Sequence, residues 1–147
     1  MLASPGLSGY RPTGSFDWMS PVFEALQAGD TEEAARRWVE TPLMKLSDPQ
    51  ADAAMREIVL SNSRIWSYRP DLRRMLSPPA VGRLAEIAVP TLVLIVSDDL
   101  PDTRRVSELL DEGIAGSRVV TLQGVGHLAN LADPENFDAA VLSFVGD

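Results

Sequence analysis

Cysteine is absent from the 147-residue sequence, and histidine occurs only once. Without cysteine there is no disulfide bond and no cysteine-ligated metal, and disulfide-free chains are typical of the cytoplasm. Long hydrophobic runs are also missing, since none approaches the roughly 20 residues that a membrane-spanning helix needs. The first residues, M-L-A-S-P-G, have neither the basic region nor the apolar core of a signal peptide. We therefore expect a cytoplasmic protein that does not bind membranes.

Positive charge is scarce as well. The 13 lysines and arginines face 21 acidic residues, so the net charge is −8. Such an excess of negative charge argues against nucleic acids and anionic membranes as partners. The hydrophobic content of 45% is that of an ordinary globular domain, which argues against wholesale disorder.

The second half of the chain predicts a strand–helix–strand–helix unit. Thr91–Val96 is an unbroken apolar run rich in branched residues, which is typical of a strand buried on both faces of a parallel sheet. A helical pattern with an apolar face follows over 101–114, then a second strand over Arg118–Leu122 and a last helix that starts at Asp133-Pro134. Because crossover connections are nearly always right-handed, we expect the two strands to be parallel neighbours.

The first half predicts helices. Apolar spacings of three and four residues indicate a short helix over 16–28. Asp30 with Glu33 forms a capping-box pattern, and Asp48-Pro49 is a second helix start. Pro78-Pro79 precedes a further short helix over 80–87. We therefore divide the chain into a loop with a strand remnant (1–14), a helical region (15–88) and the strand-containing region (89–147).

Chemically useful side chains follow both predicted strands. Asp98, Asp99 and Asp102 come directly after the first strand, and His127 lies in the Gly-rich loop after the second. An acid after one parallel strand and a histidine after the next is the order of the last two members of a Ser-Asp-His triad. In that role His127 is a general base, and the alternative is a loop histidine that only bonds to the backbone.

These residues carry a specific resemblance. V-P-T-L-V-L-I-V-x-x-D followed by G-x-G-H-L-x-N-x-x-x-P resembles the C-terminal end of an α/β-hydrolase. The resemblance implies an α/β fold that is part of the α/β-hydrolase fold, in which 15–88 is a helical cap or lid and 89–147 belongs to the core. It implies hydrolysis of carboxylic esters, lactones or similar acyl bonds, with a small apolar acyl substrate. It implies no metal and no organic cofactor.

Three residues compete for the position of the triad acid. Asp99 matches the family position best. The family often has a glycine and two further residues before the acid, and this sequence is one residue short, so Asp98 is an alternative. Asp102 stands beside Pro101, where the helix dipole favours an acid for structural reasons. We predict Asp99 and His127 as the catalytic residues.

The nucleophile is missing from the sequence. No G-x-S-x-G occurs, and Gly6-Leu7-Ser8-Gly9 lacks the spacing and the following helix. Ser8 and Ser97 are poor substitutes, since neither lies on a strand-to-helix elbow. We therefore expect a fragment, or one half of a split or truncated hydrolase, completed by an N-terminal half. The alternative is a non-catalytic module that binds a partner or forms a homo-oligomer, because the first apolar strand would lack a neighbour.

Aromatic residues concentrate in the first half of the sequence. They are Tyr10, Phe16, Trp18, Phe23, Trp38, Trp66 and Tyr68. One interpretation is that they line a cap over an apolar substrate. The interpretation that we favour is that they pack the cap helices together, because aromatic side chains dominate core burial.

Overall fold

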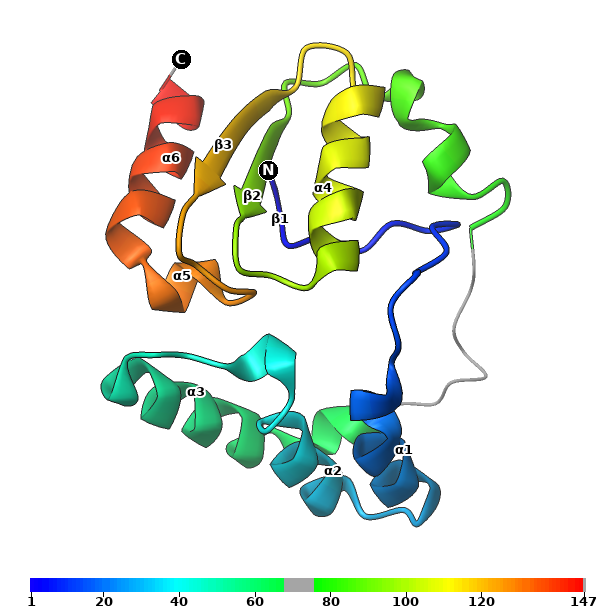
Figure 1. Cartoon of the computed structure of the whole chain (residues 1–147), viewed down its shortest axis with the longest axis vertical. Coiled ribbons are helices and arrows are strands. Elements are labelled where there is room, and N and C mark those ends of the chain that lie inside the picture. The colour runs from blue at the N-terminus through cyan, green and yellow to red at the C-terminus, as the bar shows by residue number, and fades with distance from the viewer. Residues whose placement is uncertain (68–75, 147) are drawn as a thin grey trace. The chain divides into compact units, whose positions relative to one another are not determined.

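The structure, a computed structural model that describes residues 1–67 and 76–146, contains a parallel three-stranded sheet in the order β1-β2-β3 (Figure 1). The strands are β1 (Leu2–Ala3), β2 (Leu92–Val96) and β3 (Arg118–Leu122). In register, Val93 of β2 pairs with Leu2 on one side and Val119 on the other. The predicted α/β fold with adjacent parallel strands is therefore confirmed.

One expectation about this sheet was wrong. We expected the first apolar strand to lack a neighbour, but β2 is the central strand and pairs on both edges. The remnant at the N-terminus supplies the second neighbour through only two residues, Leu2 and Ala3. Among the described residues, the open edges of the sheet therefore belong to β1 and β3.

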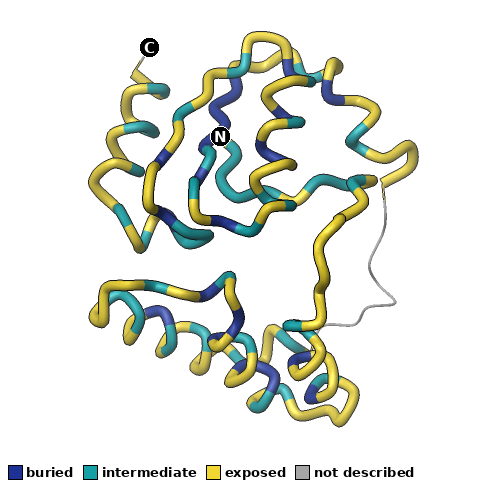
Figure 2. The backbone as a smooth tube through the Cα atoms, viewed as in Figure 1, coloured by how far each residue is buried: buried dark blue, intermediate teal, exposed yellow. Residues whose placement is uncertain are grey.

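Helices cover both faces of β2, which explains why its sequence is apolar throughout. Helix α4 (Pro101–Gly113) is the crossover from β2 to β3, and its residues Val106 and Leu110 pack with Val93. Val96, on the opposite face, packs in a cluster with Phe137 of α6 (Pro134–Gly146). The short helix α5 (Ala129–Ala132) precedes α6. Figure 2 shows the buried residues gathered along β2 and on one side of α4.

The helix predicted over 80–87 is instead two single turns of 3-10 helix, Ala80–Gly82 and Leu84–Glu86. Glycine has a low helix propensity, and the backbone of Arg83 leaves the helical region at φ −128°. Leu84 then packs closely on α4, where a Cβ at Gly113 would lie 2.7 Å from its side chain. Tertiary packing therefore determines the conformation of this segment.

The chain divides into two compact units, Met1–Gly14 with Met75–Asp147 (the sheet unit) and Ser15–Arg74 (the helical unit). By packing, residues 76–88 lie with the sheet. The assignment of 15–88 as a cap stays a prediction. Within residues 1–67 and 76–146, no helix combines the length and apolarity that crossing a lipid bilayer requires.

The helical unit begins with a 3-10 turn (Asp17–Met19). Three α-helices follow: α1 (Ser20–Gln27), α2 (Thr31–Trp38) and α3 (Pro49–Ser61). Further 3-10 turns span Pro42–Met44 and Ser63–Ser67.

Both predicted helix starts in this unit are confirmed. The Asp30 side chain accepts the Glu33 N–H at 2.8 Å, and Asp48 accepts the Ala51 N–H at 2.7 Å. These bonds satisfy backbone donors that a helix start otherwise leaves unpaired. Glu33 does not complete the capping box, because its carboxylate binds arginines of its own helix.

Aromatic side chains contribute to the core of the helical unit. Trp38 and Trp66 meet edge to face with ring centroids 5.4 Å apart, and both pack against a buried cluster that includes Val22 and Ala34. This contact agrees with the interpretation that aromatic residues hold the helices together. Tyr68 lies outside the described residues.

Candidate active site

Asp99 and His127 lie together at the carboxyl edge of the sheet. Asp99 follows β2 and His127 follows β3, and the carboxyl ends of neighbouring parallel strands open at the same edge. Nδ1 of His127 lies 2.9 Å from Oδ2 and 3.1 Å from Oδ1 of Asp99. The Asp99 side chain is 1% exposed and that of His127 is 26% exposed. A buried carboxylate is thus paired with a partly accessible imidazole.

This contact determines which nitrogen of His127 carries the proton. An ionised carboxylate only accepts hydrogen bonds, so Nδ1 must donate to Asp99. Oδ1 of Asp99 also accepts the Leu100 N–H at 2.7 Å, which fixes the carboxylate in place. In the neutral imidazole, Nε2 then keeps a free lone pair, and no described residue hydrogen-bonds to it. The arrangement holds Nε2 ready to accept a proton.

Hydrogen bonds tie the two loops to each other. The Asp98 N–H donates to the carbonyl of Val125 at 3.0 Å, and the Gly124 N–H donates to Oγ of Ser97 at 2.8 Å. Gly124 has φ +69°, a conformation that glycine adopts without strain. Val125 is buried against Val96. The position of His127 therefore depends on the loop that carries Asp99.

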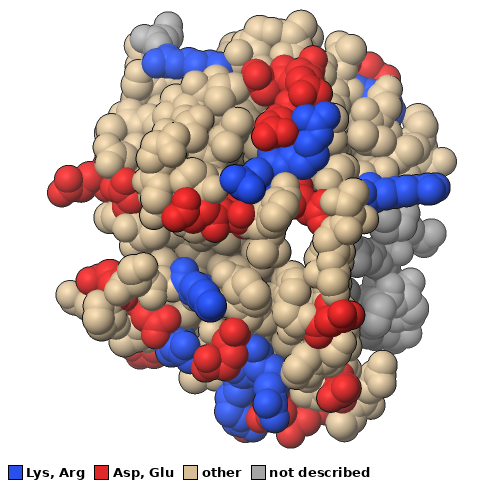
Figure 3. All heavy atoms as spheres, in the orientation of Figure 1, with Lys and Arg blue, Asp and Glu red and all other residues tan. Residues whose placement is uncertain are grey.

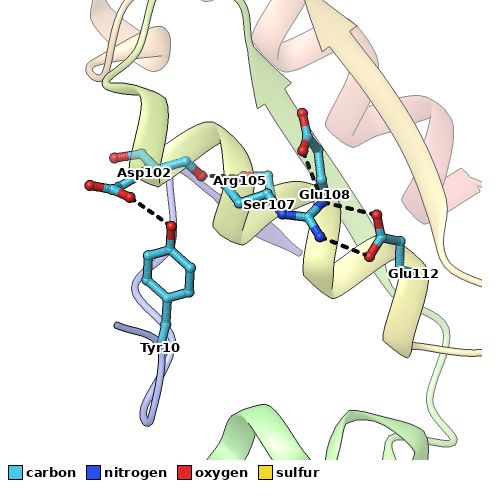
Figure 4. Close-up of polar contacts among 7 residues, drawn as sticks. Tyr10, Asp102, Arg105, Ser107, Glu108 and Glu112 are labelled. Carbon is cyan, nitrogen blue, oxygen red and sulfur yellow. Dashed lines mark hydrogen bonds and ion pairs between the residues drawn. The ribbon is translucent and has the colours of Figure 1, made fainter. Parts of the chain in front are cut away.

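The other two acids are engaged elsewhere. The exposed carboxylate of Asp98 accepts the Ser97 hydroxyl at 2.7 Å. Asp102 accepts the N–H groups of Thr13 and Gly14 at 3.0 and 2.9 Å. It also accepts the Tyr10 hydroxyl at 2.6 Å, a contact that Figure 4 shows. The Thr13 N–H, followed by the Tyr10 hydroxyl and the Gly14 N–H, lowers the pKa of Asp102 to about 2. Asp102 thus fastens the N-terminal segment to α4.

No described hydroxyl takes the position of a nucleophile on His127. Oγ of Ser97 is occupied by the Gly124 N–H, and Oγ of Ser8 is buried with no partner among the described residues. Sequence reasoning did not single out Ser4, which follows β1 with φ +42° and also has a buried, unpaired Oγ. A positive φ at a serine is uncommon and leaves no sequence signal.

Metal binding has no candidate in the part of the chain that the structure describes. No group of three or more histidine or acidic side chains there is arranged to hold an ion.

The parallel sheet, its crossover helix and the helices on both faces define part of an α/β-hydrolase fold. Solved structures with this fold resemble the chain over most of its length. MenH from S. aureus superposes with a TM-score of 0.67 at 21% identity, covering 88% of this chain and 53% of MenH. A hydrolase from Pseudomonas aeruginosa PA01 gives 0.62 at 28% identity, covering 95% and 53%. VinJ gives 0.53 at 20% identity, covering 90% and 48%.

Sequence comparison finds shorter matches. RutD of Azorhizobium caulinodans, a proposed carbamate hydrolase, is 35% identical over 65 residues, which are 44% of this chain and 24% of RutD. RutD of Pseudomonas savastanoi pv. phaseolicola is 36% identical over 62 residues, which are 42% and 24%. No family model matches the chain. The matched part thus spans about a quarter of the RutD proteins and about half of the structures. The comparisons show part of the α/β-hydrolase fold and support an α/β-hydrolase ancestry.

Proposed function

We propose that this chain supplies the acid and the base of an acyl-hydrolase site, with Asp99 as the acid and His127 as the base. The observation that carries the proposal is the contact of Nδ1 with both oxygens of the buried Asp99 carboxylate, at 2.9 and 3.1 Å. A histidine held only by the backbone would not need a buried carboxylate beside it. The position of both residues at the carboxyl edge of a parallel sheet gives further support.

In the proposed reaction, Nε2 of His127 takes the proton of a nucleophilic hydroxyl as its oxygen attacks the acyl carbon. Asp99 stabilises the imidazolium that forms, and His127 then passes the proton to the leaving group. A water molecule, deprotonated by His127 in the same way, then attacks the acyl group on the nucleophile and releases it as the carboxylic acid product. No cofactor or metal takes part. The substrate class is a small apolar ester, lactone or related acyl compound, such as the carbamates for which the RutD relatives are named.

The nucleophile and the oxyanion donors come, in this proposal, from a complementing N-terminal half. None of the 147 residues lies in a G-x-S-x-G motif. The two-residue strand β1 is an edge of the described sheet, so a further strand can pair there. Completion matters for rate, because one missing oxyanion donor alone costs a factor of about 100 or more.

Reconstitution tests this function. The DNA upstream of the Met1 codon is sequenced, any strand–G-x-S-x-G–helix segment is co-produced with the chain, and hydrolysis of p-nitrophenyl acetate is measured. We expect activity only from the combined halves. His127→Ala should abolish it, whereas Gln123→Ala, at an exposed position in the same loop, should not. Activity that survives His127→Ala would contradict the role of the base, and His127-dependent activity of the isolated chain would contradict the need for a second half.

A second function is favoured by exposed apolar side chains on β3 and α6. Val119 lies on the edge strand, and Leu142 and Val145 of α6 are 70% and 75% exposed. We propose as the alternative a non-catalytic module that self-associates through this face. Sedimentation of the wild type and of Leu142→Asp distinguishes the two, because this module predicts an oligomer that the variant dissociates and that His127→Ala leaves intact.

A further inference from the structure

A large groove runs through the helical unit. Its apolar walls are the side chains of Trp38, Ile58, Val59, Ile65 and Trp66, from α2, α3 and the turn that follows α3. Its volume is about 990 Å³, at the upper end of the range of small-molecule sites. The described residues that line the groove all belong to the helical unit.

The groove walls are unusually accessible for side chains of their kind. Ile58 is 60% exposed and Ile65 is 68% exposed, although both are large aliphatic residues. Apolar surface that remains in contact with water favours the binding of an apolar ligand part. The helix α3 places Ile58 and Val59 on the groove, whereas its Met55 is buried. This side of α3 is therefore apolar without being part of the core.

Two hydrogen-bond donors at the groove have no partner among the described residues. Arg64 lines the groove, and its guanidinium has no hydrogen bond or ion pair among the described residues. The Nε1–H of Trp66 is buried and also lacks an acceptor there. Asn62 also lines the groove, where its Nδ2 donates to the carbonyl of Ile58 at 2.7 Å. The charged group of the described lining is therefore a donor, and a ligand that carries an anionic acceptor complements it.

The unpaired state of Arg64 contrasts with the other described arginines of the unit. Arg36 and Arg37 bind Glu33, and Arg56 binds Glu40 and Asp52. Figure 3 accordingly shows basic and acidic side chains interspersed over this part of the surface. In a chain with a net charge of −8, an unpaired guanidinium beside apolar walls is a local site for an anion.

We propose that this groove binds a carboxylic acid with an apolar chain or ring, whose apolar part lies against Ile58, Ile65 and the tryptophans and whose carboxylate accepts hydrogen bonds from Arg64. Guanidinium groups match the geometry of carboxylates and bind them through two parallel bonds. This site does not require the Asp99–His127 pair. The binding proposal and the proposed hydrolase function can therefore be wrong independently of each other.

The test is binding of octanoate to the full chain, followed by tryptophan fluorescence and by calorimetry, with octanol and octylammonium as probes of the same chain length. We expect octanoate to bind about tenfold more tightly than octanol, and octylammonium to bind most weakly. Arg64→Gln should reduce the affinity for octanoate to that for octanol, whose own affinity should not change. Ile58→Glu should remove the binding of both.

Matched controls are available in the same chain. Lys45→Gln removes an exposed cation of the helical unit away from the groove, and Leu142→Glu places an acid on α6 in the sheet unit. Both should bind octanoate like the wild type. Circular dichroism checks that each variant is folded, which we expect because the altered side chains are exposed.

Four outcomes would overturn the proposal, and three of them concern the selectivity of binding or the effects of the variants. They are equal binding of octanoate and octylammonium, octanoate binding unchanged by Arg64→Gln, and a dimer that Ile58→Glu dissociates, since a second copy would then occupy the groove. Absence of saturable octanoate binding would also overturn it. None of these measurements uses hydrolytic activity, so their failure is distinct from failure of the proposed hydrolase function.

Discussion

The two units of this chain differ in how far apart in the sequence their polar partners lie. The sheet unit has local ion pairs, such as Arg105 with Glu108, but several of its contacts are long-range. Asp99 and His127 are 28 positions apart, and Tyr10 and Asp102 are 92 apart. In the helical unit, the polar contacts are mostly helix caps and ion pairs three or four positions apart, as between Glu33 and Arg36. Long-range bonds position side chains relative to one another, whereas local bonds only stabilise individual helices. The sheet unit is thus built to hold a defined site.

Both units contain buried and exposed apolar side chains, and Val93 and Ile58 represent the two kinds. Val93 of β2 is 0% exposed, whereas Ile58 of α3 is 60% exposed. A buried apolar residue serves packing, and an accessible one is available to a ligand. Val93 thus belongs to the core of the unit that carries the candidate acid–base pair, whereas Ile58 belongs to the accessible wall of the groove in the helical unit.

The largest expected effect on stability is that of Val93→Asp, and Ile58→Asp is the matched variant at an exposed position. Val93→Asp should destabilise the sheet unit by more than about 4 kcal/mol, because a carboxylate without a partner would be buried in the core. Ile58→Asp should change stability by less than about 0.5 kcal/mol, because the side chain is already in water. Urea unfolding followed by circular dichroism measures both. Similar losses for the two variants would contradict the contrast between a core position and a groove position.

Asp102 makes the stability of the sheet unit depend on pH. Its pKa is lowered from 3.8 to about 2 in the folded chain, so its contribution is fully present above pH 3.8 and is lost as the pH falls towards about 2. We expect Asp102→Asn to be less stable than the wild type at neutral pH and to lose less stability on acidification. Urea midpoints over this pH range test it, and parallel curves for the two proteins would contradict it.

Ser97 allows a test of whether a long-range hydrogen bond positions the candidate site. Its Oγ holds the Gly124 N–H at 2.8 Å, so Ser97→Ala should cost about 1 kcal/mol and loosen the loop that carries His127. Faster amide hydrogen exchange at Gly124 and Val125, with unchanged exchange in α3, is the expected signature. Unchanged exchange in the loop would show that this bond does not position His127.

The smallest effect belongs to the local ion pairs. Arg36→Ala removes a contact between exposed side chains, which are screened by water and cost side-chain entropy to hold. We expect no measurable change in the urea midpoint, and no greater salt dependence than in the wild type. A clear loss of stability would mean that local pairs in the helical unit matter more than we infer.

The sequence predicted most of the elements and left the long-range contacts open. Branched apolar residues predicted β2 and β3 as parallel neighbours, and side-chain caps predicted the starts at Asp30 and Asp48. Pairing of the two-residue β1 with β2 was not predictable, because so short a strand has no periodicity. The turns at 80–86 depend on packing of Leu84 at Gly113. Sequence spacing favoured Asp99 as the partner of His127 but did not exclude Asp98 or Asp102, because a shift of one residue changes which side chain meets the imidazole. The folded loop shows that Asp99 makes the contact.

The most direct test of the central claim is the protonation state of the ring of His127. Because the chain has a single histidine, ¹⁵N-resolved NMR of the imidazole gives one unambiguous set of signals. With the imidazole neutral, we predict that Nδ1 carries the hydrogen and Nε2 is bare, and that Asp99→Asn abolishes this preference while Asp98→Asn leaves it unchanged. A hydrogen on Nε2 in the wild type, or the same spectrum in Asp99→Asn, would contradict the assignment of Asp99 and His127 as an acid–base pair.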